Sequence, residues 1–218
     1  MEPHPQPLSL VRRGENEAES LSQQALEEYQ VNQLPKAIEL WQQALKIYLE
    51  LDDKPATITT LKNLIAVNQQ IRNYPQSIIY LEQYLTLTRE IEDKSGEISA
   101  LTTLAKIHAQ QGKFTKAVDY YQQALILVRE TNNQSEQAVI LGNLAIAYKT
   151  LGNYPKAIAT NQQSLEILQQ TGNRKDAGIV FKNLGNVYEA LGDYDNAITS
   201  YEKACKSHEK LITKELKG

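Results

Sequence analysis

A period of forty residues runs through most of the chain and constrains its fold more than any other feature. When the 218 residues are read in steps of forty, several columns hold an apolar residue at every step. One of these columns comprises Leu45, Leu85, Leu125, Leu165 and Cys205. Since 41% of the residues are hydrophobic, chance would fill such a column in only about 1% of cases. The chain is therefore an array of similar structural repeats.

Each repeat has the pattern of two amphipathic helices. In the last repeat, Phe181, Leu184 and Tyr188 follow one another at the spacing of one helical face. Gly192 predicts a left-handed stop to that helix, and Ala197 begins the apolar stripe of the next one. Prolines stand where three of the second helices should begin, a position at which a missing N–H is harmless; they are Pro35, Pro75 and Pro155.

Small residues recur where neighbouring helices would approach each other closely. They form three columns: Ala37, Ala117, Ala157 and Ala197; Ala44, Ala124 and Ala204; and Ala105, Ala145 and Gly185. Because neither helix of a pair can bury its stripe alone, successive pairs must stack. The sequence therefore predicts an all-α solenoid over residues 17–218, with repeats at about 17–56, 57–96, 97–136, 137–176 and 177–216. Residues 1–16, which contain three alternating prolines, are expected to form a disordered leader, and whether they belong to the native protein is left open.

The columns resemble those of the tetratricopeptide repeat family. The last repeat has the motif most completely, as Leu184, Gly185, Asn186, Tyr188, Gly192, Asp193, Tyr194, Ala197, Tyr201 and Ala204. The forty-residue length is similar to that of kinesin light chains, spindle-orientation adaptors and many bacterial arrays. The resemblance implies a right-handed α-solenoid of five helix-turn-helix repeats that acts as a protein-interaction scaffold or adaptor. An alternative is a regulatory or sensor segment of a signalling enzyme that is encoded separately or lost from this chain.

The second repeat departs from the motif at four positions. It has Asn68 for the usual aromatic residue, Arg72 for glycine, Ser77 for alanine and Tyr84 for alanine. These departures favour looser packing in this repeat. The alternative is a compensating rearrangement around Tyr84.

The resemblance also implies that the first helices line a concave face that binds a peptide. The candidate binding residues are the polar residues off the packing stripe, namely Lys62, Asn63, Lys106, Asn143, Lys149, Lys182, Asn183 and Asn186. An asparagine amide donates to and accepts from a peptide backbone at once, and lysines attract negative charge. We therefore expect repeats 2 to 5 to bind a short acidic segment. The competing interpretation is an ordinary solvated helix face.

Other classes of function find little support in the sequence. Cys205 has no spacing partner for a metal site and is expected to be a small core residue, and His108 is expected to be a packed helix residue and not a base. We expect no enzyme activity, no metal and no cofactor. The net charge of −3 argues against nucleic-acid and membrane partners. The expected protein is cytoplasmic, and either a monomer or a weak homodimer formed through Ile212 and Leu216 of the C-terminal helix.

Overall fold

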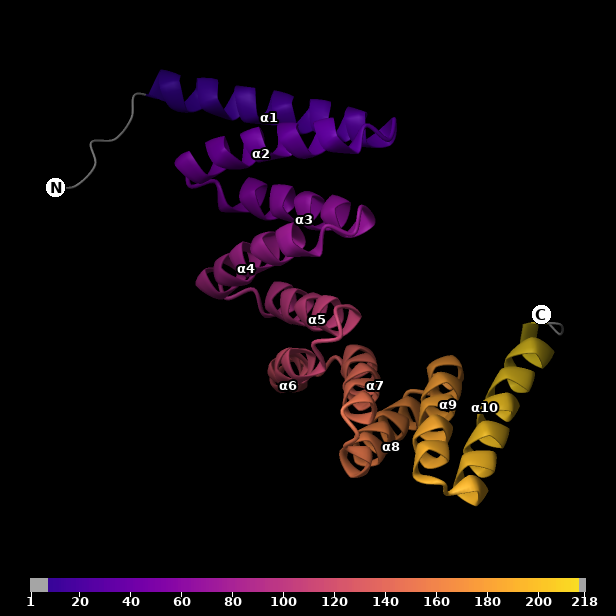
Figure 1. The fold of residues 1–218 in the computed structure, drawn as a ribbon. Coiled ribbons are helices and arrows are strands. Elements are labelled where there is room, and N and C mark those ends of the chain that lie inside the picture. Colours follow the sequence, from indigo (N-terminus) through magenta and orange to yellow (C-terminus); the bar gives the residue numbers. More distant parts are fainter. Residues whose placement is uncertain (1–7, 216–218) are drawn as a thin grey trace. The chain divides into compact units, whose positions relative to one another are not determined.

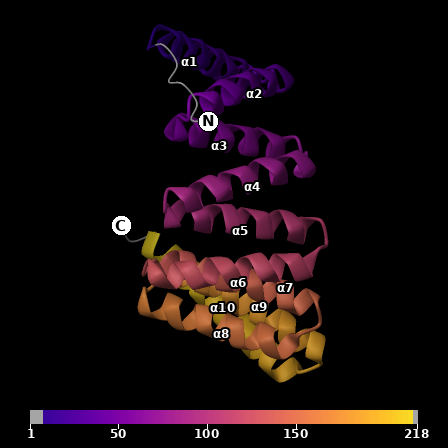
Figure 2. The ribbon, with the colours of Figure 1, turned by 90° about the vertical axis from the view of Figure 1, so that its left-hand side faces the viewer.

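The computed structural model describes the backbone of residues 8–215 and the side chains of residues 12–207, and over this part of the chain it is built of helices. The helices are α1 (Leu8–Gln30), α2 (Leu34–Glu50), α3 (Lys54–Gln70), α4 (Tyr74–Glu90), α5 (Lys94–Gln110), α6 (Phe114–Glu130), α7 (Gln134–Thr150), α8 (Tyr154–Gln170), α9 (Arg174–Leu191) and α10 (Tyr194–Glu215). They fall into two compact units, Met1–Gly96 and Glu97–Gly218, whose border coincides with the predicted border between repeats 2 and 3. Within each unit, consecutive helices run back alongside one another (Figure 1). In unit 1, α1 to α4 follow one another in chain order (Figure 2). The predicted all-α array of helix pairs is confirmed.

The turns have a period of twenty residues within the period of forty. A residue with positive φ occurs once in every turn, at Asn32, Asp52, Arg72, Glu92, Gly112, Asn132, Gly152, Gly172 and Gly192. The left-handed conformation reverses the chain after each helix, and glycine and asparagine tolerate it best. The predicted stop at Gly192 is confirmed, with φ at 76°.

The residue that follows each left-handed position usually caps the next helix. The side-chain oxygens of Asp53, Asn73, Asp93 and Asn173 accept hydrogen bonds from backbone N–H groups three residues later, at 3.0, 3.5, 2.9 and 3.2 Å. Such a bond satisfies one of the N–H groups that a helix start leaves without an internal partner. A residue in the left-handed conformation thus ends one helix, and the Asp or Asn that follows it starts the next. This pair of local signals sets the length of the helices.

The small-residue columns lie at the helix contacts, as predicted. Ala37, Ala117 and Ala157 are fully buried, and so is Ser77 in the same column. In unit 2, a core of Leu165, Leu168, Val180 and Leu184 joins α8 to α9, with Ala138 of α7 and Ala177 completing it. In unit 1, Ala18, Ala44 and Tyr48 join α1 to α2. The pair α7 and α8 thus buries its stripe against α9 of the next pair, and α1 and α2 bury theirs against each other.

Repeat 2 has rearranged around Tyr84. This tyrosine is 3% exposed in a column that otherwise holds alanine or serine, and its hydroxyl lies 2.8 Å from where a Cβ at Gly96 would stand. Glycine at position 96 therefore makes room for the larger side chain. Asn68 is also buried, and its amide donates to the backbone oxygen of Leu64 at 2.8 Å. These contacts favour the compensating rearrangement over looser packing.

Two expectations were wrong at the ends of the array. Helix α1 begins at Leu8, so residues 8–16 are helical, and Gly14 lies against Ile47 and Leu51; the prolines at positions 3, 5 and 7 all precede the helix and lie outside the described residues. Cys205 is exposed, although its column is buried elsewhere, because no described helix covers this face of α10. Ile212 and Leu216 lie beyond the residues whose side chains are described.

Candidate functional site

The first helices of unit 2 present a stripe of side chains away from their buried faces. On α7 the stripe consists of Val139, Asn143, Ile146 and Thr150, at spacings of four, three and four residues. These spacings place the four residues on one line along the helix. The equivalent residues are Ser99, Thr103, Lys106 and Gln110 on α5, and Ile179, Asn183, Asn186 and Ala190 on α9. We call these twelve residues the first-helix stripe. Helices α7 and α9 contact each other directly, so their parts of the stripe are neighbours.

The stripe carries exposed aliphatic residues on α7 and α9. Val139, Ile146 and Ile179 are 46%, 43% and 50% exposed. Ile146 is expected on this face from the sequence, but none of the three is among the candidate binding residues, which are all polar. The sequence does contain a signal for this surface. Val139 and Ile179 are aliphatic residues forty positions apart, and both lie off the buried stripe of their helix.

The predicted asparagines lie between these aliphatic residues. Asn143 and Asn183 are half-buried on the stripe. Asn186 is half-buried as well, and its Oδ1 accepts a hydrogen bond from the phenol of Tyr201 at 2.8 Å. The same hydroxyl lies 2.7 Å from Oε2 of Glu189, and donation to this carboxylate raises the pKa of Tyr201. Tyr201 of α10 thus fixes the side chains of two residues on the exposed side of α9.

Three of the predicted lysines also belong to unit 2. Lys106 lies on the stripe of α5 and is exposed, whereas Lys149 of α7 is half-buried and Lys182 of α9 is exposed beside the stripe. Glu189 is the acidic residue in the same part of α9, and it is engaged by Tyr201. The exposed side of these first helices therefore has a positive balance, within a protein whose net charge is −3.

The remaining predicted residues, Lys62 and Asn63, belong to α3 of unit 1. Lys62 is exposed, and its Nζ lies 5.4 Å from the ring centroid of Tyr84, a cation–π contact. Asn63 is half-buried. On the neighbouring first helices, the Tyr29 hydroxyl donates to Oε1 of Gln70 at 3.0 Å, which links α1 to α3. Six of the eight predicted residues thus belong to unit 2, and the other two belong to unit 1.

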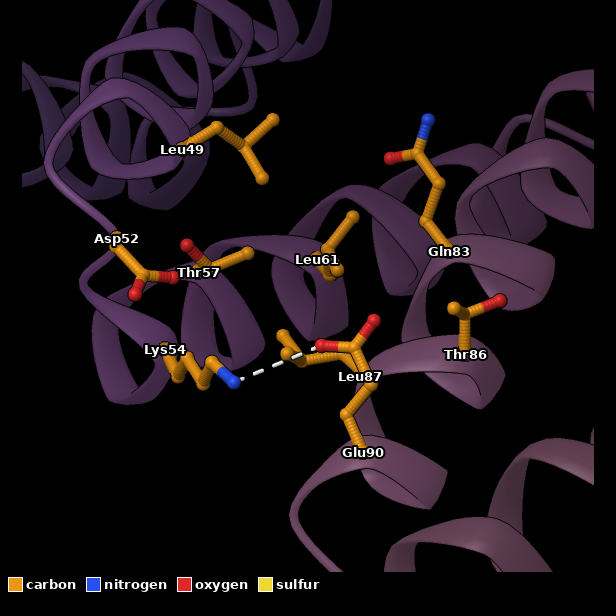
Figure 3. A pocket seen from close by; sticks show the side chains of 9 residues that line it. All are labelled: Leu49, Asp52, Lys54, Thr57, Leu61, Gln83, Thr86, Leu87 and Glu90. Atoms are coloured by element: carbon orange, nitrogen blue, oxygen red, sulfur yellow. Dashed lines mark ion pairs between the residues drawn. The ribbon is translucent and has the colours of Figure 1, made fainter. Parts of the chain in front are cut away.

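A separate cleft lies in unit 1 between α2, α3 and α4 (Figure 3). We call it the unit-1 cleft. It has a volume of about 410 Å³ and is lined by Leu49, Asp52, Lys54, Thr57, Leu61, Gln83, Thr86, Leu87 and Glu90. Lys54 Nζ and Glu90 Oε2 form an ion pair of 3.6 Å across one side of it. The cleft therefore combines an apolar surface with one ion pair and the further negative charge of Asp52.

The described residues contain little that points to catalysis. His108 is 5% exposed and its ring stacks on Tyr120, with centroids 5.4 Å apart and planes 1° from parallel; its predicted packing role is confirmed. Among the described residues, no group of three or more His, Cys, Asp or Glu is placed to hold a metal ion. Within the same part of the chain, no helix is both long enough and apolar enough to span a membrane.

Comparison with known proteins identifies relatives of this architecture. A tetratricopeptide repeat family model matches residues 16–90, 60–130, 96–170 and 136–210. The structure of BtubC (BKLC) from P. vanneervenii is 20% identical, with a TM-score of 0.74, over 93% of this chain and 91% of that chain. A putative kinesin light chain from Podosopora anserina with nearly identical TPR-like repeats is 19% identical, with a TM-score of 0.71, over 88% of this chain and 95% of that one. A Rap protein complexed with Competence and Sporulation Factor is 20% identical, with a TM-score of 0.62, over 88% of this chain and 54% of that one. No curated protein sequence matches. At these identities, the solved structures establish a shared fold.

Proposed function

This chain belongs to the tetratricopeptide repeat family, and from that premise we propose that it is a protein-interaction scaffold whose first-helix stripe binds an extended segment of a partner protein. The observation that carries the proposal is the pairing of exposed aliphatic residues with asparagines on α7 and α9. An aliphatic residue about half exposed on a rigid helix gains free energy when a ligand covers it. An asparagine beside it fixes the register of the ligand's backbone.

The aliphatic residues set the scale of the interaction. Fully burying a Val or Ile side chain contributes about 1.5–3 kcal/mol, so covering the exposed half of Ile146 or Ile179 contributes about 1 kcal/mol each. Loss of both therefore weakens binding by about 2 kcal/mol, or roughly 30-fold in Kd. The partner segment carries at least one large apolar side chain for this surface.

The lysines support an acidic character for the same segment. Lys106 and Lys149 add positive charge near the aliphatic residues, and Lys182 adds more on α9. Charge of this kind mainly speeds association and selects among partners, and it contributes less to affinity than burial does. The segment is therefore apolar where it meets α7 and α9, with acidic residues flanking that part.

The Rap neighbour gives the proposal a structural precedent. That protein was crystallised in complex with Competence and Sporulation Factor. It shares the fold of this chain over about half of its own length. The precedent supports a helical-repeat array of this architecture as a binder of another molecule, and the first-helix stripe supplies the surface in this chain.

The test is affinity purification from the cell that produces the protein, with quantitative mass spectrometry. The wild-type chain is compared with an Ile146→Asp/Ile179→Asp variant and with an Ile79→Asp/Ile126→Asp control. The control residues are 46% and 60% exposed on the second helices α4 and α6, so both variants change charge and surface apolarity alike. Partners retained by the control and lost by the stripe variant support the proposal. Partners retained equally by both variants contradict it.

The acidic character has its own test. A Lys106→Glu/Lys149→Glu variant is compared with Lys46→Glu/Lys116→Glu, in which exposed lysines of α2 and α6 are reversed. Weaker capture by the first variant alone supports an acidic partner segment. Equal capture rejects the electrostatic part and leaves the apolar part standing.

A further inference from the structure

A second cleft lies in unit 2 between the end of α8, the start of α9 and α10. We call it the unit-2 cleft. Its volume is about 390 Å³, and it is lined by Leu168, Gln169, Gly172, Arg174, Ala177, Phe181, Lys203, Lys206 and Ser207. None of these residues belongs to the first-helix stripe. The cleft falls within the range of volumes that ligand pockets have in other proteins.

The unit-2 cleft is the same architectural feature as the unit-1 cleft, three repeats later. Subtracting 120 from eight of its nine lining positions gives positions 49, 52, 54, 57, 61, 83, 86 and 87, all of which line the unit-1 cleft. The forty-residue period therefore builds this hollow independently in both units. Because the backbone frame is shared, differences between the two clefts come from their side chains.

The two clefts differ mainly in charge. In the unit-1 cleft, Asp52, Lys54 and Glu90 sum to −1, and the Lys54–Glu90 ion pair closes one side (Figure 3). At the equivalent positions the unit-2 cleft has Gly172 for Asp52 and Arg174 for Lys54. Two positions that are neutral in the unit-1 cleft, Gln83 and Thr86, correspond to Lys203 and Lys206 in the unit-2 cleft. Its lining charges, Arg174, Lys203 and Lys206, sum to +3.

The change from negative to positive charge extends to one more position of the sequence. The position equivalent to Glu90 is Lys210, whose side chain is not described. Glu202 lies 3.9 Å from Lys206, but both side chains are well exposed, at 63% and 71%, where water screens the pair. A concentration of three cations in one hollow is not expected from composition, because the protein as a whole is acidic.

The cleft also has an apolar surface beneath its cations. Leu168 and Ala177 are buried core residues, and Phe181 is partly buried against the same core. Lys203 Nζ lies over the ring of Phe181, 5.7 Å from its centroid, so its ammonium makes a cation–π contact with this apolar surface. Arg174 offers a planar guanidinium that matches the two oxygens of a carboxylate.

We propose that the unit-2 cleft is a second binding site, which takes an acidic residue adjacent to a large apolar residue in a segment of a partner protein. The apolar side chain covers Phe181 and its neighbours, and the carboxylate pairs with Arg174 and the two lysines. Charge complementarity selects this occupant over a neutral apolar segment, which the unit-1 cleft would accept equally well. The site is independent of the first-helix stripe and does not rest on its function.

A titration followed by ¹⁵N–¹H NMR tests the proposal with a defined probe. The probe is acetyl-Glu-Leu-Glu-Phe-amide, and the comparison is its neutral analogue, acetyl-Gln-Leu-Gln-Phe-amide. The acidic peptide should shift amide signals of residues 172–181 and 203–207 and leave those of residues 52–61 and 83–90 unchanged. The neutral peptide should bind the unit-2 cleft at least tenfold more weakly. Equal shifts from both peptides, or shifts of equal size in both clefts, would overturn the proposal.

Variants separate local charge from net charge. Lys203→Glu/Lys206→Glu should weaken the acidic peptide at least tenfold, whereas Lys46→Glu/Lys116→Glu, with the same change in net charge, should weaken it less than twofold. All four lysines are exposed, so circular dichroism should show that both variants fold. The stripe variant Ile146→Asp/Ile179→Asp should bind the peptide as the wild type does, which keeps this test separate from that of the proposed function. In a further titration, sodium sulfate replaces the peptide. If sulfate shifts the same amide signals as strongly as the peptide does, the cleft is a general anion site, and the proposed contact of an apolar side chain with Phe181 is wrong.

Discussion

The contact between Gly185 and Tyr201 determines whether Gly185→Ala stabilises or destabilises the protein. Gly185 lies in the interior of α9, where alanine is ordinarily more stable by about 1 kcal/mol. A Cβ at this position would stand 2.5, 2.7 and 2.9 Å from three ring atoms of Tyr201. The ring is held in place because its hydroxyl lies within hydrogen-bond distance of Asn186 Oδ1 and of the Glu189 carboxylate. We therefore expect Gly185→Ala to destabilise the protein.

The magnitude follows from two opposing contributions. Overfilling a packed site costs about 1–3 kcal/mol, while the helix gains about 1 kcal/mol from alanine. The net change in the free energy of unfolding is therefore a loss of about 1 kcal/mol. When Tyr201 is first replaced by alanine, the clash disappears and the same Gly185→Ala substitution should stabilise by about 1 kcal/mol. The coupling between the two positions is then about 2 kcal/mol.

Urea unfolding followed by far-ultraviolet circular dichroism measures these changes. Gly142→Ala provides a matched control in the interior of α7, because a Cβ there would lie 3.9 Å from Val180 Cγ2, an ordinary contact. This control should be stabilised by about 1 kcal/mol. If Gly185→Ala raises stability in the wild type as much as Gly142→Ala does, the packing argument is wrong.

Further predictions concern single residues of both units. Arg72→Gly should raise the free energy of unfolding by about 1 kcal/mol, because its φ of 57° is costly for a residue with a Cβ; no gain in urea unfolding would contradict this. Asn161 is fully buried, and neither amide atom has a hydrogen-bond partner among the described residues, so Asn161→Leu should stabilise by about 1–2 kcal/mol; a lower urea midpoint would refute this. Burial raises the pKa of Tyr121 to about 12, so the stability it contributes is complete below its unfolded pKa of about 10 and is lost as the pH rises towards 12. The wild type should therefore lose stability relative to Tyr121→Phe over this range, and parallel losses would count against it. Cys205 should react with a disulfide reagent in the native protein within about tenfold of its rate in urea, and a thiol that reacts only after unfolding would show that its face is covered.

The sequence was sufficient for the helices because their determinants are local. Gly192, the proline at position 155 and the alanine at position 197 each fix a turn, a start or a close contact within one repeat. These signals recur often enough to define the array without knowledge of distant contacts. The same is true of His108, which stands forty residues after Asn68 in the column that usually holds an aromatic residue, and which is buried as expected.

Burial at the ends of the array is not local, and there the sequence misled. Cys205 occupies a leucine column, yet a column is buried only when the next helix covers it. Residues 8–16 belong to helix α1, in which Gly14 lies against Leu51 and Ile47, a contact that the composition of the leader does not reveal. The candidate site was only partly predictable for a related reason. Val139 and Ile179 look like core residues in the sequence, and only their exposed fractions identify them as a binding surface.

Photo-crosslinking in the cell that produces the protein tests whether a partner protein lies on the first-helix stripe. A benzoylphenylalanine residue is placed at Ile146 on the first-helix stripe, and in a second experiment at Ile126, which is 60% exposed on α6. We expect a discrete crosslinked partner from position 146 and none from position 126. A partner that crosslinks from position 126 alone, or equally from both, would contradict it.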